Sequence, residues 1–452
     1  MSFPKDFVWG AAAASYQVEG GAYEDGKGLS VWDIFCRQPG KVREGNTGDI
    51  SCDHYHRYAE DTGLMGEIGL KAYRLSISWP RVLPDGVGKV NEKGLAFYDR
   101  LVDSLLENSV QPWITLFHWD YPYELYKRGG WLNPDSSDWF TEYTGVVVDK
   151  LSDRVSHWMT LNEPQVFIDA GHREGRHAPG LELGYTDLLT AAHNSLLAHG
   201  KAVQVIRVRA RSDAVVGAAP VGATMIPATD DVKDIEAARS KMFSVRDKIF
   251  MNNTWFSDPM ILGRYPVDGL ELFGSDIPEF PDSDMNIICQ PLDFYGVNIY
   301  QGEYVRATPD GGNEVVTGTD IPMLTTMDWP ITPQALYWGP RFLYERYKLP
   351  IVVTENGIAN MDWVHRDGKV HDLQRIDYLG RHLLELGRAI DDGVGVNGYF
   401  VWSIMDNFEW AHGYRQRFGI IYVDYTTGQR IMKDSARWYK EVIATNGESI
   451  SG

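Results

Sequence analysis

Two glutamates stand at the ends of segments that have the pattern of buried strands. Glu163 lies in the segment TLNEP (residues 160–164), and Glu355 lies in VVTENG (residues 352–357). An apolar strand has no structural need of a terminal glutamate, although either residue alone could be an exposed loop carboxylate. Together they form the pair that cleavage of a glycosidic bond requires. One carboxyl group protonates the departing oxygen, while the other attacks the sugar carbon or activates water.

Other groups of reactive residue types do not match a cofactor site. Asp53, His54, His56 and Glu60 are close in sequence, but their spacing matches neither HExxH nor a zinc finger. A solvated helix start with Asp53 as N-cap is the better interpretation. Residues 21–27 resemble the start of a phosphate-binding loop, but glycine occupies position 28, where serine or threonine is required. We therefore predict neither a metal nor an organic cofactor.

The elements that must hold the two glutamates alternate along the chain. Short runs of β-branched and aromatic residues alternate with longer runs of helical periodicity. The predicted strands are Phe7–Ala13, Ala72–Trp79, Gln111–Trp119, His157–Asn162, Ala214–Val221, Leu292–Tyr300, Pro350–Glu355 and Val396–Ile404. The predicted helices are His54–Ile68, Glu92–Glu107, Ser137–Leu151, Thr186–Arg209, Ile235–Phe256, Pro333–Tyr347, Leu373–Asp391 and Lys433–Ile443. The alternation predicts an α/β protein with a parallel sheet, and eight unbroken units favour a single (β/α)8 TIM barrel over residues 1–452.

Polar and aromatic side chains gather at the ends of these strands. They are Arg74, Trp79, His118, Trp119, Asn162, Asn298, Tyr300, Thr354 and Trp402, in addition to the two glutamates. In a (β/α)8 barrel the C-terminal ends of all strands meet at one face, which carries the active site. We therefore expect residues that are distant in the sequence to converge on one pocket.

Composition restricts the class of partner. The net charge is −19, so the chain would repel nucleic acid and anionic membranes. Aromatic residues make up 12% of the chain. They could fill a large core, or they could form a carbohydrate site, because sugar rings have apolar faces that pack on flat aromatic rings. A small-molecule substrate is therefore expected, and a homo-oligomer remains open.

Cysteine usage and the first residues bear on the compartment. Cys36, Cys52 and Cys289 are far apart and show no CxxC spacing, which argues against a disulfide framework and fits a reducing cytoplasm. The first residues lack the basic and apolar regions of a signal peptide. No apolar stretch approaches the roughly 20 residues that span a bilayer. We expect a cytoplasmic protein.

Six segments, taken in order, resemble glycoside hydrolase family 1, and the resemblance extends over nearly the whole chain. They are FVWGAAAASYQVEG (7–20), YRLSISW (73–79), TLFHW (115–119), TLNEP (160–164), TENG (354–357) and WSIMDNFEW (402–410). The resemblance implies a retaining enzyme of the β-glucosidase type. Such an enzyme removes terminal non-reducing β-D-glucosyl residues from small β-glucosides and short β-linked oligosaccharides, as in cellulose degradation. β-Galactosyl and β-fucosyl residues are further candidates.

The resemblance also implies a role for each matching residue. Glu163 would be the general acid/base and Glu355 the nucleophile, with their carboxyl groups about 5–5.5 Å apart, as retention requires. Tyr300 would hydrogen-bond the nucleophile, with Arg74 beside it, and Asn298 would orient the acid/base. The residues expected to bind substrate are Asn162 at the 2-hydroxyl, Gln17, His118, Trp119, Trp402, Glu409 and Trp410 around the sugar, and Trp329 under the leaving group.

Departures from the family pattern leave the leaving group open. Ile299, the pair Gln165-Val166 and the segment 219–222 each differ from frequent family residues. Two other functions also remain. A 6-phospho-β-glycosidase would have a basic phosphate-binding loop in place of Glu409 and Trp410, and a non-catalytic sugar-binding barrel would have lost one of the two glutamates. Glu409 could alternatively pair with Arg415 or Arg417 at the surface.

Overall fold

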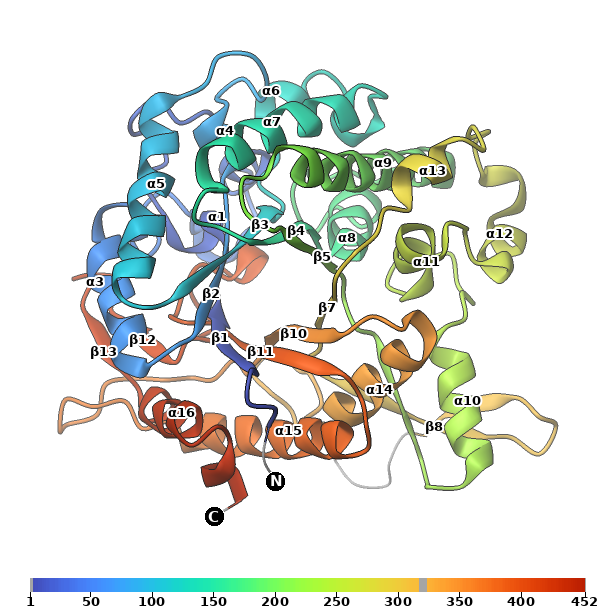
Figure 1. Cartoon of the computed structure of the whole chain (residues 1–452). Coiled ribbons are helices and arrows are strands. Elements are labelled where there is room, and N and C mark those ends of the chain that lie inside the picture. The colour runs from blue at the N-terminus through green and yellow to red at the C-terminus, as the bar shows by residue number, and fades with distance from the viewer. Residues whose placement is uncertain (1–2, 317–322, 452) are drawn as a thin grey trace.

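Eight parallel strands form the centre of the molecule in the computed structural model, which describes residues 3–316 and 323–451. Their order is β5-β4-β3-β2-β1-β11-β10-β7, so the first strand of the chain pairs with the last one in the sheet (Figure 1). The strands are β1 Val8–Ala12, β2 Ala72–Ser76, β3 Gln111–Phe117, β4 His157–Asn162, β5 Val215–Ala219, β7 Tyr295–Asn298, β10 Ile351–Asn356 and β11 Val396–Trp402. All eight predicted strands are therefore confirmed.

Backbone contacts between β5 and β7 complete the barrel. The Asn298 N–H donates to the Pro220 carbonyl at 3.0 Å, and the Gly222 N–H donates to the Asn298 carbonyl at 2.8 Å. The two strands approach so closely that a Cβ on Gly296 would lie 2.4 Å from the Ala218 carbonyl oxygen, so glycine is required there. The predicted (β/α)8 barrel is confirmed.

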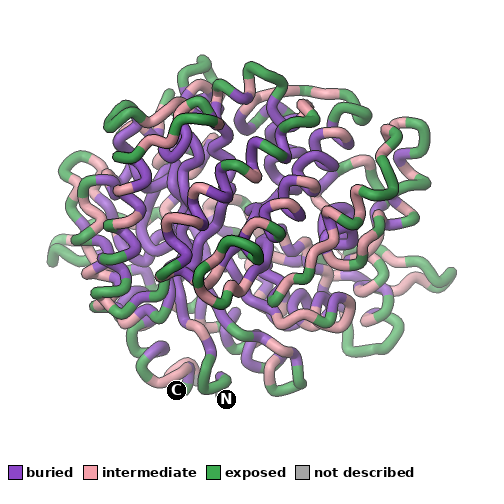
Figure 2. The backbone as a smooth tube through the Cα atoms, turned by 45° about the horizontal axis from the view of Figure 1, so that its top comes forward, coloured by how far each residue is buried: buried purple, intermediate pink, exposed green. Residues whose placement is uncertain are grey.

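Helices surround the strands (Figure 1). Their inner faces are buried and their outer faces exposed (Figure 2). In α5, for example, Phe97, Leu101 and Leu105 are buried at four-residue spacing, which gives one apolar stripe toward the barrel. The principal helices are α3 His54–Ile68, α5 Glu92–Glu107, α7 Ser136–Leu151, α9 Tyr185–Arg209, α10 Val232–Met242, α11 Thr254–Leu262, α14 Ala335–Tyr347, α15 Leu373–Asp391 and α16 Asp434–Ala444.

Shorter elements decorate the loops of the barrel. The short helices are α1 Ser15–Val18, α2 Val31–Phe35, α4 Trp79–Val82, α6 Tyr123–Tyr126, α8 Pro164–Ile168, α12 Val267–Phe273 and α13 Asp284–Ile288. The additional strands are β6 Thr224–Pro227, β8 Gly302–Ala307 and β9 Asn313–Val315, which form a small sheet, and β12 Ile421–Val423 with β13 Arg430–Met432. In the part of the chain that the structure describes, no helix combines the length and apolar character needed to cross a membrane.

The predicted helix Ile235–Phe256 is wrong, because two helices with a connecting segment occupy this region. α10 ends at Met242 and α11 begins at Thr254. Two asparagines satisfy the backbone groups at the break. Asn253 Nδ2 donates to the Met242 carbonyl at 2.8 Å, and Asn252 Oδ1 accepts from the N–H of Trp255 at 2.9 Å. Side-chain bonds of this kind compete with helix continuation. The connecting segment lines the mouth of the pocket described below.

The start of α3 also differs in detail from the prediction. Asp53 precedes the helix but does not cap it. Its carboxylate instead pairs with His56 Nδ1 at 2.6 Å. His54 points elsewhere and pairs with the buried Asp61 at 2.8 Å, while Glu60 accepts from Arg57. The four residues considered as a metal cluster are thus held in three separate contacts.

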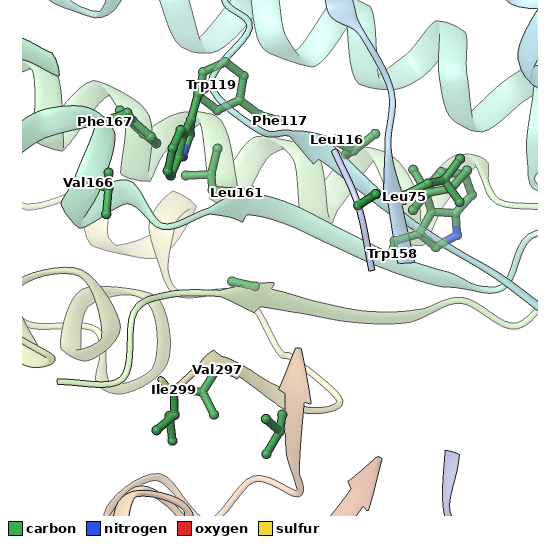
Figure 3. Close-up of a cluster of buried hydrophobic side chains, with 14 of the residues drawn as sticks. Leu75, Leu116, Phe117, Trp119, Trp158, Leu161, Val166, Phe167, Val297 and Ile299 are labelled. Atoms are coloured by element: carbon green, nitrogen blue, oxygen red, sulfur yellow. The ribbon is translucent and has the colours of Figure 1, made fainter. Parts of the chain in front are cut away.

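Two apolar layers fix the barrel and its rim. The outer layer lies between strands and helices. Figure 3 shows part of it, where Phe117, Leu161 and Phe167 lie together, and the rings of Phe117 and Phe167 meet edge to face at 5.2 Å. The inner layer fills the barrel, with Trp113 packed on Phe400 at 5.0 Å. This layer forms a floor beneath the C-terminal ends of the strands.

The first and last parts of the chain are joined by side-chain hydrogen bonds. Trp9 Nε1 donates to Asn446 Oδ1 at 2.9 Å, and Asn446 Nδ2 donates to the Phe3 carbonyl at 2.8 Å. The first and last described residues consequently lie on the same side of the molecule (Figure 1).

Candidate active site

A cavity of about 910 Å³ opens at the C-terminal ends of the barrel strands. Most of the residues predicted for the site line it. They are His118, Trp119, Glu163, Asn298, Tyr300, Trp329, Glu355, Trp402, Glu409 and Trp410. Gln17, Arg74 and Asn162 lie behind this lining and hydrogen-bond to residues within it. The predicted residues therefore converge, as the barrel topology requires.

Glu355 is held at both carboxylate oxygens. It lies in β10 and is 3% exposed. Arg74, from β2, donates Nη1 to Oε1 at 2.5 Å, and the Tyr300 hydroxyl donates to Oε2 at 2.7 Å. A guanidinium and a phenol both favour the ionised form of the acid that they contact. This carboxyl group is therefore oriented and stabilised as an anion.

Glu163 has a different environment. It follows β4 in the left-handed region, with φ of 43°, and Pro164 then begins α8. This conformation is costly for a residue other than glycine and is typical of functional sites. Among the described residues, one side-chain hydrogen bond reaches its carboxyl group, from Asn298 Nδ2 at 2.9 Å to Oε1. No cationic side chain is bonded to it there.

The unequal environments separate the two acids electrostatically. Burial, followed by the negative charge of Glu355, raises the pKa of Glu163 to about 8. Burial also raises the pKa of Glu355, but Arg74 and Tyr300 both act in the opposite direction. The pKa of Tyr300 lies well above its ordinary value because of burial and the adjacent carboxylates, so the phenol keeps its proton. Near neutral pH, the proton shared by the pair resides on Glu163.

Two asparagines link the acids to the rest of the site. Thr354 Oγ1 donates to Asn298 Oδ1 at 2.6 Å, which turns the Asn298 amide so that Nδ2 faces Glu163. Arg74 Nη2 donates to Asn162 Oδ1 at 2.5 Å, and Asn162 Nδ2 lies 3.0 Å from His118 Nε2. Burial and then Arg74 hold the pKa of His118 well below its ordinary value. The ring is neutral, and its Nε2 accepts the amide proton.

Aromatic rings form one wall of the cavity. Trp410 lies 4.6 Å from Trp119, and the His118 ring is stacked between Trp402 and Trp410 at 5.8 and 5.9 Å. Both Trp119 and Trp410 adopt positive φ, at 78° and 47°. The indole N–H of Trp119 donates to the Asn162 carbonyl at 3.0 Å. These contacts fix flat surfaces that suit the apolar face of a sugar ring.

Two residues that support this wall were missed by the sequence analysis. Tyr16 stacks on Trp410 at 6.1 Å with an interplanar angle of 10°, and Trp32 packs against it at 4.6 Å. Tyr16 directly precedes Gln17, and Trp32 lies in α2. Tyr16 falls inside a segment that carries the family resemblance, which was the one available signal. Nothing in the sequence marked Trp32.

Glu409 faces the cavity. Its carboxyl oxygen Oε2 lies 3.4 Å from Gln17 Nε2, and Gln17 is fixed by a 2.9 Å bond to the Phe408 carbonyl. Burial and then the charge of Glu355 raise the pKa of Glu409 to about 8. Within the described residues, Glu409 forms no ion pair with Arg415 or Arg417, and Arg417 bonds Asp406 at 2.6 Å instead. The sugar pocket thus has a third carboxyl group in addition to Glu163 and Glu355, and this group is protonated near neutral pH.

The mouth of the cavity is built from the loops after β4, β5 and β7. Trp329 lies here, with its ring 5.2 Å from that of Tyr300. Gln165 joins two of the loops, since its Oε1 accepts from the N–H of Val221 at 3.2 Å and its Nε2 reaches the Asn252 carbonyl at 3.4 Å. Val166, already noted with Gln165, also lies here, and the mouth residues that the sequence analysis did not identify include Met225, Lys241, Met242, Arg246, Met251, Glu303 and Val315.

Comparison with known proteins agrees with this geometry. The family described as glycosyl hydrolase family 1 matches residues 1–448. The chain is 47% identical to a 1,4-β-D-glucan glucohydrolase of Thermotoga neapolitana, over 98% of this chain and 99% of that protein. It is 40% identical to an aryl-phospho-β-D-glucosidase of Bacillus subtilis, over 99% and 98% of the two chains. A β-glucosidase from Thermotoga maritima, solved in complex with glucoimidazole, superposes with a TM-score of 0.90 at 45% identity, covering 99% of both chains. The chain therefore belongs to glycosyl hydrolase family 1.

Proposed function

We propose that this protein is a retaining β-glucosidase in which Glu355 is the nucleophile and Glu163 the general acid/base. The observation that supports these roles best is the unequal environment of the two buried carboxyl groups. Arg74 and Tyr300 hold Glu355 in the form that can attack. Glu163 has the raised pKa of a group that can deliver a proton near neutral pH.

In the first step the Glu355 carboxylate attacks the anomeric carbon and the bond to the leaving oxygen breaks. Glu163 transfers its proton to that oxygen as it departs. The product is a glycosyl ester on Glu355, which no longer carries a negative charge. Because that charge contributes to the raised pKa of Glu163, the pKa falls when the ester forms.

In the second step Glu163, now ionised, accepts a proton from water. The water attacks the anomeric carbon from the face that the leaving group vacated, and the ester bond to Glu355 breaks. Two inversions at one carbon give net retention. Asn298 positions Glu163 through a 2.9 Å bond in the free enzyme, and this bond also favours the ionised acid.

Recognition of the glucosyl unit follows from the groups around the acids. Asn162, which precedes Glu163 in the sequence, is our candidate for the contact to the 2-hydroxyl group. His118 and Glu409, with Gln17 behind Glu409, supply donors and acceptors for the remaining hydroxyl groups, and Trp402 and Trp410 supply flat apolar surfaces. Trp119 holds the Asn162 backbone. We place the leaving group against Trp329, at the mouth.

The cavity of about 910 Å³ suits small β-glucosides and short β-linked oligosaccharides, including those released from cellulose. β-Galactosides and β-fucosides are further substrates to test, since they differ from glucosides at the positions that Gln17 and Glu409 would read.

The three cysteines are free thiols. Burial raises the pKa of Cys36 and Cys52 to about 12. Free thiols fit the proposed cytoplasmic location.

A 6-phosphorylated sugar is the competing substrate. The neighbouring loop carries Glu409 and Trp410 rather than a basic phosphate-binding sequence. Repulsion between Glu409 and a phosphate was the expected basis of discrimination, but a pKa of about 8 weakens that repulsion at neutral pH. Discrimination between the two substrates then depends on the hydroxyl contacts of Glu409 and on the segment 406–410, which has no basic side chain to bind a phosphate. Parallel hydrolysis of a 4-nitrophenyl β-glucoside and its 6-phosphate decides between the two substrates.

Leaving-group dependence tests the two roles. Glu163→Ala should slow glycosylation strongly for an alkyl β-glucoside and little for a dinitrophenyl β-glucoside, because a good leaving group departs without a proton. The dinitrophenyl substrate should show a burst as the glycosyl ester accumulates. Glu355→Ala should abolish turnover of both while the fold survives. Equal losses with both substrates in the Glu163 variant, or near wild-type rates in the Glu355 variant, would reject the assignment.

A further inference from the structure

Six charged side chains are packed together where the loops after β10 and β11 meet the start of α16. Most are almost inaccessible to solvent, and Arg417 is the most exposed, at 15% of its side chain. The cations are Arg375, Arg417 and Lys433, and the anions are Asp362, Asp372 and Asp406. Equal numbers of opposite charges make this burial tolerable, since a buried charge without a partner is strongly destabilising.

Lys433 joins the two loops within this cluster. Its ammonium group is fully buried and lies 2.5 Å from Asp362 Oδ2 and 2.7 Å from Asp406 Oδ1. Asp362 belongs to the loop after β10, and Asp406 to the loop after β11. Burial acts to raise the pKa of Asp362, but Arg375 and Lys433 lower it, so the carboxylate is charged. One cation directly before α16 thus bridges two anions from different loops.

The bridged loops carry groups that face the pocket. Glu355 lies seven positions before Asp362, and Glu409 lies three positions after Asp406. Glu409 has one long side-chain contact, at 3.4 Å from Gln17, so its position depends mainly on the backbone. The backbone of this loop is held at Asp406, whose carboxylate accepts hydrogen bonds from the Gly419 N–H at 3.0 Å and from Arg417 at 2.6 Å.

We propose that Lys433 is a positioning residue for the sugar subsite formed by Glu409 and Trp410, an inference that rests on the proposed function. Without its charge, Asp362 and Asp406 are left with fewer cations than anions and repel one another. The two loops then separate, and Glu409 moves relative to Glu355. A misplacement of about 1 Å at a reacting site can cost up to about a hundredfold in rate.

The test compares Lys433→Met in two backgrounds, wild type and Glu409→Ala, with Lys440→Met as control. Lys440 is exposed on α16, the helix that Lys433 directly precedes. In wild type, Lys433→Met should lower kcat/KM for a β-glucoside by about tenfold, mainly through KM. In the Glu409→Ala background, Lys433→Met should lower kcat/KM by less than about threefold, because the carboxyl group that Lys433 positions is already absent. Lys433→Arg should retain most of the wild-type kcat/KM, and Lys440→Met should leave kcat/KM unchanged.

A double substitution that keeps the cluster neutral distinguishes loss of positioning from misfolding. Lys433→Met combined with Asp406→Asn removes the same link and leaves two cations with two anions, and it should show the same dependence on Glu409. An equal loss in both backgrounds would show that Lys433 only stabilises the fold and would overturn the inference. If Glu409→Ala alone leaves KM unchanged, the assigned role of Glu409 fails and this inference fails with it. The roles of Glu163 and Glu355 are tested separately by their leaving-group dependence.

Discussion

Glu355→Gln imitates the charge state of the glycosyl ester and should lower the pKa of Glu163. The ester and the amide are both neutral at the position that a carboxylate occupies in the free enzyme. At the separation of about 5.5 Å expected for retention, and at an effective dielectric near 20, the lost repulsion is about 3 kcal/mol, or about two pKa units. The pKa of Glu163 should therefore fall from about 8 to about 6.

Carbon-13 NMR of glutamate-labelled protein measures this directly. The Glu163 signal is identified by its absence from Glu163→Gln, and its chemical shift is followed from pH 4 to pH 10. Glu409→Gln is the matched control, because Glu409 contributes less to the raised pKa than Glu355 does. Its effect should be smaller but in the same direction. A Glu163 pKa that is unchanged in Glu355→Gln would refute the acid-to-base conversion on which the second step depends.

Three further predictions concern the sugar, the product and stability. Glu409→Ser should weaken hydrolysis of a β-glucoside by about tenfold, consistent with up to about 1.5 kcal/mol for a hydrogen bond made by a neutral carboxyl group, and should leave hydrolysis of the 6-phosphate no slower. Proton NMR of the early reaction should show the β-anomer of the released sugar, and the α-anomer appearing first would indicate inversion. Glu163 has a folded pKa of about 8 against an ordinary value of 4.5, so its stabilising effect is complete below about pH 4.5 and is lost as the pH rises to about 8. The free energy of unfolding of wild type, measured with urea, should therefore decrease relative to that of Glu163→Gln across this range, by on the order of a few kcal/mol.

The barrel and its two glutamates were predictable because each depends on a local pattern. Buried parallel strands are short apolar runs, and their order around a closed barrel follows from the order in the sequence. The ends of β4 and β10 therefore indicated Glu163 and Glu355 as neighbours. The helices α3, α5 and α15 matched their predicted bounds, since their amphipathic periodicity is continuous.

Features that depend on distant contacts were not predictable in the same way. The break after Met242 is made by side-chain bonds from Asn252 and Asn253, and the residues between the helices have ordinary helical periodicity. Trp32 supports Trp410 from the short helix α2, which carries no recognisable motif. The charge cluster around Lys433 brings together residues from three separate segments, whose pairing no local spacing reveals.

The pairing of β1 with β11 constrains how the protein can be made. Folding on the ribosome proceeds from the first residues onward, yet β1 has no partner on one side until β11 has emerged. The sugar pocket needs Gln17 from the first loop and Glu409 from the last, so it is assembled only after nearly the whole chain has left the ribosome tunnel. The same adjacency suits circular permutation. A short linker between the neighbourhoods of Phe3 and Asn446, which are already hydrogen-bonded, would allow new termini to be opened in an exposed loop on the far side of the barrel.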